Sequence, residues 1–423
     1  MVGSTTTTSL IRFSCCRALL KRDKEIKIMK EFITLEEIYD AYYQCRRRKR
    51  RTSSALDFEM HYERELRKLW KELNEGKYNI SKSIVFGVTR PKHREVFAAN
   101  FRDRIVHHLL MMKLEKIIES EMIDNSYSCR KGKGVEYGLK TLQKQINKVS
   151  DCYNVRTYAL QCDIQGFFMS INKDLMFKKV KELMLNKWGS GNIEFWINLV
   201  EKIIKNRPEL NCEIRGDKTI LDNLPDNKTL FRGNGKGLPI GNLNSQIFGN
   251  YYLCDFDKML LKEIGETMEY GRYVDDFYII GRDKEQMLKL IDKIRKFLKV
   301  NNQLTLHPNK ISITDVRKGI KFIGGVVKPW GIYVGNRTVY NAFYAFSYFK
   351  NHNLEQYVQR LNSYFGFMRH RLSYGIRYNL YKTIKKTPKI ICVDMKKFKL
   401  IKSLKYKKKC GQKLKSVKKA LKQ

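Results

Sequence analysis

The chain has 423 residues, of which 84 are Lys or Arg and 43 are Asp or Glu, so its formal net charge is +41. With 43% hydrophobic and 12% aromatic residues, the composition excludes a disordered chain, and the length allows two or three packed subdomains. No stretch approaches the roughly 18 uncharged apolar residues of a membrane helix. We therefore expect no membrane partner. Because so large a positive charge needs a counter-charge, we expect a nucleic acid to supply it; the alternatives are a ribosome-associated protein or a protein at an anionic membrane surface.

The cysteines give no sign of a metal or disulfide scaffold. None of the ten forms a Cys-x-x-Cys pair, and the seven histidines do not cluster beside them. The spacing argues against a zinc finger, and the length argues against a disulfide framework. Reduced thiols fit best, so we expect a cytoplasmic protein.

The N-terminal part begins with a Ser/Thr-rich segment, residues 1–28. We expect a flexible start there, because the segment lacks the apolar core and cleavage site of a targeting peptide. Thr34 and Glu37 are spaced as a capping box that begins a helix. Six consecutive cations follow at 46–51, where we favour a phosphate contact over a solvated helix end. An apolar stripe over 58–70 predicts a second helix.

The next segment reads as a hairpin followed by a helix. Residues 84–89 and 95–98 are two strands joined by a turn that contains Lys92 and Arg94, so the tip of the hairpin is cationic. A long helix is expected over 101–121. A strand over 157–163 then ends in a carboxylate, Asp163, whereas 207–236 is polar and irregular.

The C-terminal half contains the clearest hairpin, residues 268–280, with Asp275 and Asp276 at its tip. A helix over 284–300 and strands near 311–313 and 320–327 complete a β-α-β-β-α-β order, which predicts a split βαβ sheet. A further amphipathic helix covers 354–371. Residues 385–423 hold 16 Lys and one acidic residue, which is typical of a solvated tail that also holds a polyanion loosely.

The carboxylates carry the chemistry. Adjacent Asp275 and Asp276 sit amid apolar and aromatic residues, where they repel each other unless a cation neutralises them, although aspartates are also ordinary turn residues. Asp163 joins them if its strand is their neighbour. Oxygen-only ligands suit Mg²⁺, and two such ions activate a 3′-hydroxyl and stabilise a leaving pyrophosphate. The pattern indicates nucleotidyl transfer.

A loop at 236–246 contains two glycines and a proline and leads into a helical pattern. It is no phosphate-binding P-loop, because no Gly-Lys-Ser/Thr follows. We expect its backbone to pack against a base pair beside the carboxylates.

Taken in order, seven segments resemble the successive motifs of reverse transcriptases: residues 101–104, 126–134, 163–168, 237–246, 273–276, 306–310 and 322–325. Within that superfamily the chain is most similar to the reverse transcriptases of diversity-generating retroelements. That similarity rests on the strings at 102–108 and 130–134 and on the loop at 238–246, where Ile240 stands at a position that is Gln in many other reverse transcriptases. The resemblance covers about residues 29–370.

The resemblance implies a site. Asp163, Asp275 and Asp276 would be the catalytic set that binds two Mg²⁺, with the carbonyl of Ile164 as a further ligand. The other roles that the resemblance implies concern binding of the dNTP and of the nucleic acid. For each Lys or Arg among these residues, the alternative is that it is only a surface charge. Phe168 would exclude a 2′-hydroxyl, Lys92 and Arg94 would grip the triphosphate, Lys310 would donate a proton to pyrophosphate, Ile240 would lie near the base pair, and Arg102, Arg104, Arg130, Lys131 and Lys133 would contact nucleic acid.

The resemblance also implies an α+β right-hand polymerase, with fingers at 29–155, a palm at 156–330 built on the split βαβ antiparallel sheet, a short helical thumb at 331–385 and a basic tail at 386–423. The expected activity is RNA-directed DNA synthesis. The expected partners are template RNA, primer or cDNA, dNTPs and a ring-forming basic accessory protein, in a bacterial or phage-encoded system that transfers adenine-mutated cDNA into a variable gene. The alternatives are an antiphage-defence or retron-type reverse transcriptase and an inactive basic RNA-binding protein.

Overall fold

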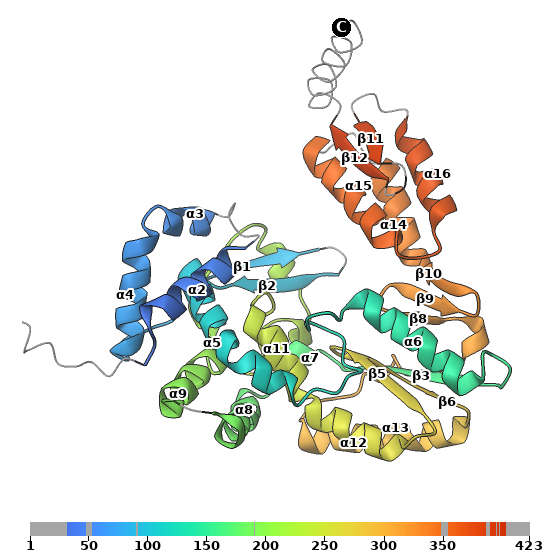
Figure 1. Ribbon diagram of the computed structural model, residues 1–423, viewed down its shortest axis with the longest axis horizontal. Helices are drawn as coiled ribbons and strands as arrows, with labels where there is room; N and C mark the ends of the chain where they lie inside the picture. The colour runs from blue at the N-terminus through green and yellow to red at the C-terminus, as the bar shows by residue number, and fades with distance from the viewer. Residues whose placement is uncertain are drawn as a thin grey trace, which may run out of the picture. The chain divides into compact units, whose positions relative to one another are not determined.

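The computed structural model describes residues 32–47, 53–89, 92–189, 191–347, 354–385, 390–394, 396 and 398–402. The chain divides into two compact units, each made of two stretches of sequence (Figure 1). Unit 1 comprises Met1–Glu121 and Phe168–Tyr252, and unit 2 comprises Met122–Phe167 and Leu253–Gln423. The flexible start, cations 48–51 and the tail beyond residue 402, all expected from the sequence, lie outside the described residues.

The N-terminal helices of unit 1 begin at side-chain caps. α2 (Leu35–Arg46) starts at Thr34, whose hydroxyl accepts from the Glu37 amide at 3.2 Å while the Glu37 carboxylate accepts from the Thr34 amide at 3.1 Å, so the capping box is confirmed. The apolar stripe over 58–70 belongs to two helices, α3 (Ser53–Glu59) and α4 (Tyr62–Asn74), rather than one. α5 (Phe101–Glu119) confirms the long helix and is capped by Asn100.

A small sheet and further helices complete unit 1. β1 (Ser83–Val88) and β2 (Arg94–Ala98) pair antiparallel, which confirms the hairpin. β4 (Cys212–Ile214) joins β1 in parallel, so the segment expected to be irregular contributes a strand. The remaining elements are α7 (Phe167–Ser170), α8 (Lys173–Lys187), α9 (Ile193–Ile204), η1 (Pro208–Leu210), α10 (Thr219–Asp222), η2 (Asp226–Lys228) and α11 (Leu243–Tyr252).

Unit 2 is built on the expected split βαβ sheet. Its four antiparallel strands lie in the order β5-β6-β3-β7, where β3 is Tyr158–Asp163, β5 is Glu269–Tyr273, β6 is Asp276–Gly281 and β7 is Ser312–Asp315. Helices α12 (Cys254–Ile264) and α13 (Lys284–Asn301) lie along one face and α6 (Val135–Ser150) along the other (Figure 1).

Alternation along β6 explains the two layers. Phe277 contacts Phe256 of α12, which in turn contacts Phe297 of α13. Tyr278 and Ile280, on the opposite face, share a buried cluster with the α6 side chains Leu139, Leu142 and Ile146. Successive strand residues point to opposite faces, so both sides of β6 are covered.

The unit boundaries differ from the expected consecutive domains. α6 was expected in the fingers at 29–155, but its apolar stripe packs on the sheet of unit 2. Residues 168–252 were expected in the palm, but α11 packs against α5 and α8 within unit 1. Each segment joins its compact unit through the apolar face that it buries, so the two units do not follow the consecutive order of the expected ranges.

A second sheet and a helical subdomain follow in unit 2. β8 (Ile320–Phe322), β9 (Gly325–Lys328) and β10 (Gly331–Val334) form a separate antiparallel sheet, so the strand expected at 320–327 is not part of the split βαβ sheet; η3 (Val316–Lys318) precedes it. Next come α14 (Asn336–Ser347), α15 (Leu354–Met368) and α16 (Tyr374–Lys385). Within the described part of the chain, no helix has the length and apolar character required to cross a membrane.

The helical subdomain extends into residues expected to be tail. β11 (Ile390–Asp394) and β12 (Lys399–Lys402) pair antiparallel. Asn362 of α15 bonds both the carbonyl and the amide of Leu400, at 2.9 and 2.8 Å, and the ring of Phe398 stacks on Phe365 at 5.4 Å. The apolar side chains of Phe398 and Leu400 thus anchor this segment to the helices.

Candidate active site

Three aspartates lie at one end of the β3–β6 pair. The two strands run antiparallel with Asp163 directly opposite Asp276. β5 and β6 are joined by a two-residue turn, Val274–Asp275, because Tyr273 pairs with Asp276. The sequence had suggested that Asp276 is part of the tip, but it is the first residue of β6. This register brings Asp276 next to Asp163.

The electrostatics of this end disfavour negative charge. Burial of the carboxyl group, followed by the carboxylates of Asp275 and Asp163, raises the pKa of Asp276 to about 7, although Lys310 acts in the opposite direction. The Asp276 residue is nevertheless solvent-exposed at the strand end, so water screens part of this effect. A carboxyl group in such surroundings is one whose charged form a nearby cation stabilises.

A lysine already supplies one positive charge. The Lys310 ammonium forms an ion pair with Oδ2 of Asp163, whose side chain is only 9% exposed. The loop of Lys310 is fixed to the sheet, because the His307 amide donates to the Asp163 carbonyl at 2.8 Å and the Gln165 amide donates to the Thr305 carbonyl at 2.9 Å. These bonds use the backbone on either side of Ile164 and not the Ile164 carbonyl itself.

The donor set fits Mg²⁺ in chemistry, since aspartate and backbone oxygens are its usual ligands. Among the described residues, however, no three His, Cys, Asp or Glu side chains are already gathered around one point as a ligand group. The pairing of Asp163 with Asp276 gives two converging carboxylates, and Lys310 stands where a cation would balance them.

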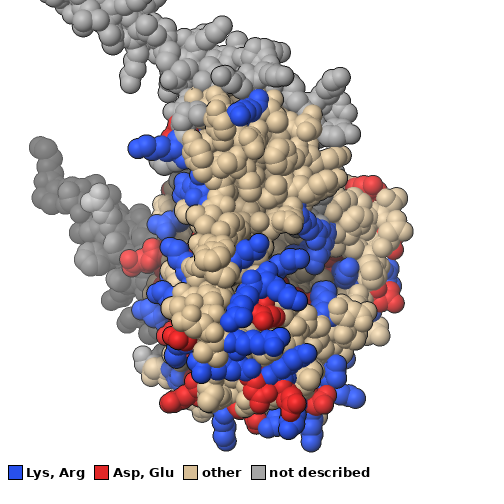
Figure 2. All heavy atoms as spheres, turned by 90° about the vertical axis from the view of Figure 1, so that its right-hand side faces the viewer, with Lys and Arg blue, Asp and Glu red and all other residues tan. Residues whose placement is uncertain are grey.

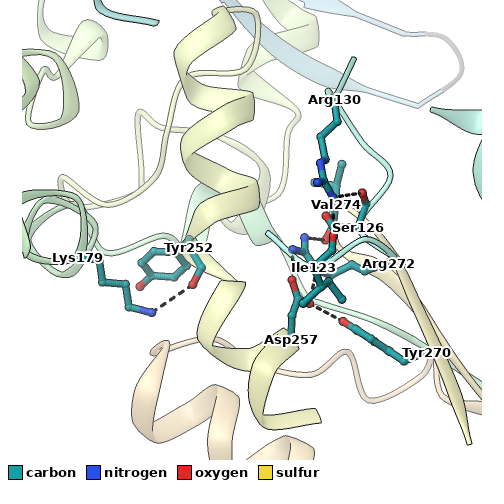
Figure 3. Close-up of polar contacts among 9 residues, drawn as sticks. All are labelled: Ile123, Ser126, Arg130, Lys179, Tyr252, Asp257, Tyr270, Arg272 and Val274. Carbon is teal, nitrogen blue, oxygen red and sulfur yellow. Dashed lines mark hydrogen bonds and ion pairs between the residues drawn. The ribbon is translucent and has the colours of Figure 1, made fainter. Parts of the chain in front are cut away.

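A buried network behind the turn was not predicted from the sequence (Figure 3). Arg272 of β5 is fully buried and donates to both carboxylate oxygens of Asp257, from Nε at 2.7 Å and from Nη2 at 2.5 Å. Its third nitrogen, Nη1, donates to the carbonyl of Val274 at 3.0 Å. Tyr270 donates its hydroxyl to Asp257 at 2.7 Å. Little in the sequence pointed to it, because the strand also contains Glu269 and arginines are abundant in this chain.

The glycine-proline loop lies in unit 1, where it is bonded on two sides. The Ile240 carbonyl accepts from the Phe97 amide of β2, and the Leu238 amide donates to the Phe168 carbonyl, both at 2.8 Å. Ile240 packs beside a buried cluster that includes Phe97 and Met169. Phe168 and Ile240 therefore belong to one bonded backbone assembly.

Two glycines make the bonding of this loop feasible. Gly237 and Gly241 have φ of +88° and +123°. A Cβ on Gly241 would lie 2.7 Å from the Phe97 carbonyl oxygen, and one on Gly237 would lie 3.0 Å from the Met169 backbone. Only glycine combines these dihedral angles with such close backbone approach.

The other dNTP candidates lie on the β1–β2 hairpin. Lys92 and Arg94 are both exposed, and Arg94 pairs with Val88 at the start of β2. Residues 90 and 91, at the expected tip, are not among those described.

Several cations expected to contact nucleic acid are engaged within their own unit. Arg102 forms an ion pair with Glu72, and Arg104 donates to the Ala99 carbonyl at 2.9 Å. Arg130 donates to the carbonyls of Ile123 and Ser126, at 2.5 and 2.8 Å (Figure 3). Lys133 bonds the carbonyl of Asp124 at 2.6 Å, whereas Lys131 is exposed. Part of their role is thus to brace loops.

Basic side chains are nonetheless abundant on the surface. Figure 2 shows Lys and Arg side chains spread over the face that it displays, with fewer acidic side chains among them. This distribution agrees with the net charge of +41 and with a polyanionic partner.

Comparison with known proteins gives a family. Over 294 residues the chain is 23% identical to Protein YkfC of Escherichia coli (strain K12), which corresponds to 62% of this chain and 70% of that protein. The structure is similar to two of apo telomerase from Candida tropicalis. The structure of telomerase truncated from its C-terminal domain has a TM-score of 0.43 and 11% sequence identity, and the second structure has a TM-score of 0.44 and 11% sequence identity. The matches span 55% and 64% of those chains and 60% and 77% of this one.

The model of the family described as reverse transcriptase (RNA-dependent DNA polymerase) matches residues 82–327. This span includes β3, the β5–β6 hairpin and the three aspartates, and it is more than half of the sequence. The chain therefore belongs to the reverse transcriptase family.

Proposed function

We propose that this member of the family copies an RNA template into DNA at the end of the β3–β6 pair, and that Asp163, Asp275 and Asp276 hold two Mg²⁺ with the carbonyl of Ile164. The observation that supports this most is the register that places Asp163 directly opposite Asp276. Burial, and then the carboxylates of Asp275 and Asp163, raise the pKa of Asp276, and a bound cation would offset this effect. Divalent ions bound there would activate the 3′-hydroxyl of a primer and stabilise the leaving pyrophosphate.

The chain's own residues supply charge balance and shape. Lys310 forms the ion pair with Asp163, and in this proposal its ammonium would donate a proton to the leaving pyrophosphate. Phe168 lies beneath the sugar and rejects a 2′-hydroxyl. Lys92 and Arg94 grip the triphosphate from the β1–β2 hairpin, where their exposure leaves them accessible.

The five further cations contact the nucleic acid, with Lys131 as the exposed member of the set. In this proposal unit 1 acts as the fingers, the four-stranded sheet of unit 2 as the palm, and α14 to α16 with β11 and β12 as the thumb. This division follows the packing of each segment, whereas the ranges expected from the sequence are consecutive.

We further propose that the enzyme serves a diversity-generating retroelement, with an element-encoded RNA template, a ring-forming basic accessory protein and adenine-directed errors. Ile240 supports this proposal. Its side chain is apolar and packs beside the Phe97 cluster, whereas a Gln there could hydrogen-bond the nascent base pair. One net hydrogen bond is worth about 0.5–1.5 kcal/mol, so Ile240 changes error rates by roughly tenfold at most.

Copying a defined RNA that contains all four bases, followed by sequencing of the cDNA, tests the retroelement proposal. Wild-type errors should concentrate opposite template adenine, and Ile240→Gln should reduce them by up to about tenfold. Rare errors, or errors spread evenly over the four bases, contradict the retroelement proposal. Errors at adenine that Ile240→Gln leaves unchanged contradict only the role given to Ile240.

A further inference from the structure

The turn that carries Asp275 has an unfavourable backbone. Val274 has φ of +59°, in the left-handed region, where a β-branched side chain is a genuine outlier. The two-residue connection between β5 and β6 requires this conformation, because hairpin turns of this length need a positive φ in the turn. Glycine would adopt it freely, but valine stands there, so the surrounding structure must hold the turn in place.

Arg272 bonds the backbone of this turn. Its guanidinium bonds two different groups: Nε and Nη2 donate to Asp257, and Nη1 donates to the Val274 carbonyl (Figure 3). The Val274 carbonyl belongs to the peptide unit that leads directly into Asp275. The planar fork therefore ties the strained peptide to α12 through Asp257, which the Tyr270 hydroxyl also bonds.

The backbone of Arg272 is fixed as well. Its amide donates to the Asn125 carbonyl and its carbonyl accepts from the Tyr127 amide, both at 2.9 Å. Arg130 in turn bonds the Ser126 carbonyl in the same segment. The edge of β5 is thus held by residues 125–127, and the Arg272 side chain reaches the turn from an immobilised strand.

We propose that Arg272 is a positioning residue for catalysis: through the Val274 carbonyl it holds the strained turn in the one conformation that aims Asp275 and Asp276 at the metal. This inference rests on the metal site proposed above. It differs from a purely structural ion pair, because an ion pair needs only the two bonds to Asp257, whereas the third bond serves the turn.

Arg272→Lys is the informative substitution. Lysine keeps a positive charge opposite Asp257, but a single ammonium lacks the fork that spans Asp257 and the Val274 carbonyl. Loss of an outer partner of this kind lowers metal affinity by roughly 10- to 100-fold. Arg282→Lys is the matched control: Arg282 follows the far end of β6 and donates from Nε to the Val149 carbonyl at 2.8 Å, so the same chemical change occurs away from the aspartates.

The readout is binding of Mn²⁺ to the full chain, measured by the loss of the free-ion signal in electron paramagnetic resonance. Arg272→Lys should weaken binding by at least tenfold, whereas Arg282→Lys should leave it within about twofold. Adding Val274→Gly to Arg272→Lys should restore most of the affinity, because glycine adopts the turn without help. If Arg272→Lys does not fold, the neutral pair Arg272→Met/Asp257→Asn removes the bond to Val274 without leaving a buried charge, and Asn still accepts from Tyr270.

The outcomes separate this inference from the proposed function. Mn²⁺ binding by Arg272→Lys, or by the neutral pair, within about threefold of wild type overturns the positioning role. Failure of Val274→Gly to restore the affinity also overturns it, because the loss then comes from the ion pair and not from the turn. If the Asp275→Asn variant binds Mn²⁺ with the same affinity as wild type, the proposed metal site itself is wrong, whatever the role of Arg272.

Discussion

His107 makes the stability of unit 1 depend on pH. It lies in α5 with 6% of its surface exposed, and burial lowers its pKa from 6.5 to about 3, with His108 and Arg104 acting in the same direction. Its Nδ1 has no hydrogen-bond partner among the described residues. Folded His107 therefore stays neutral at a pH where the unfolded chain takes up a proton. The contribution of neutral His107 to the free energy of unfolding is complete above pH 6.5 and is lost as the pH falls towards 3.

The magnitude follows from the difference in proton uptake. Between about pH 7.5 and 5.5 the unfolded imidazole gains most of one proton while the folded one gains almost none, which lowers the free energy of unfolding by about 1.4 kcal/mol. His107→Leu removes this contribution. Any change in packing caused by leucine shifts the stability at both pH values alike, so the difference between wild type and variant should change by about 1.4 kcal/mol across this range.

Urea unfolding followed by tryptophan fluorescence measures this difference. Three of the four tryptophans, Trp70, Trp188 and Trp196, lie in unit 1 with His107, so the signal reports mainly on that unit. A gap between wild type and His107→Leu that stays constant from pH 7.5 to 5.5 refutes the reasoning, because it means that His107 takes up its proton in the folded state as readily as in the unfolded one.

Three further predictions concern substrate and charge. Phe168→Ala should lower the preference for dNTP over rNTP in primer extension, and an unchanged ratio would mean that Phe168 only packs. Lys310→Met should enlarge the rise in melting temperature that Mg²⁺ produces, since Asp163 loses its internal counter-ion; an equal rise contradicts the pairing. Truncation after Lys402 keeps β12 and removes nine Lys, so the salt dependence of RNA affinity should flatten by roughly 0.7–0.9 for each phosphate that those lysines neutralise, and an unchanged slope means that they neutralise none.

Local patterns in the sequence were enough to predict the parts of the fold that depend on neighbours in the chain. The capping box at Thr34, the β1–β2 hairpin and the β5–β6 hairpin are each set by residues within a short segment. The split βαβ order was also predictable, because strands and helices alternate with clear periodicity. Strand adjacency predicted that Asp163 converges with the turn at Asp275, and the observed register places it opposite the next residue, Asp276.

Features that depend on distant partners were not predictable in this way. α6 follows the N-terminal helices in sequence, yet the stripe through Leu142 packs on the sheet of unit 2. β12 lies in a lysine-rich segment whose few apolar residues, such as Leu400, decide its packing. The partnership of Arg272 with Asp257 spans two elements, and in so basic a chain one more arginine gives no signal of its own.

DNA synthesis on an RNA template by wild type and Asp275→Asn tests the central claim most directly. Asparagine keeps the shape of the side chain but removes the charge that the proposed metal site requires, so the fold and the affinity for RNA should remain. We expect primer extension by wild type and a loss of roughly a thousandfold or more in Asp275→Asn, which corresponds to about 4 kcal/mol of transition-state stabilisation. Extension by Asp275→Asn within about tenfold of wild type would show that the carboxylates at the end of the β3–β6 pair do not carry the reaction.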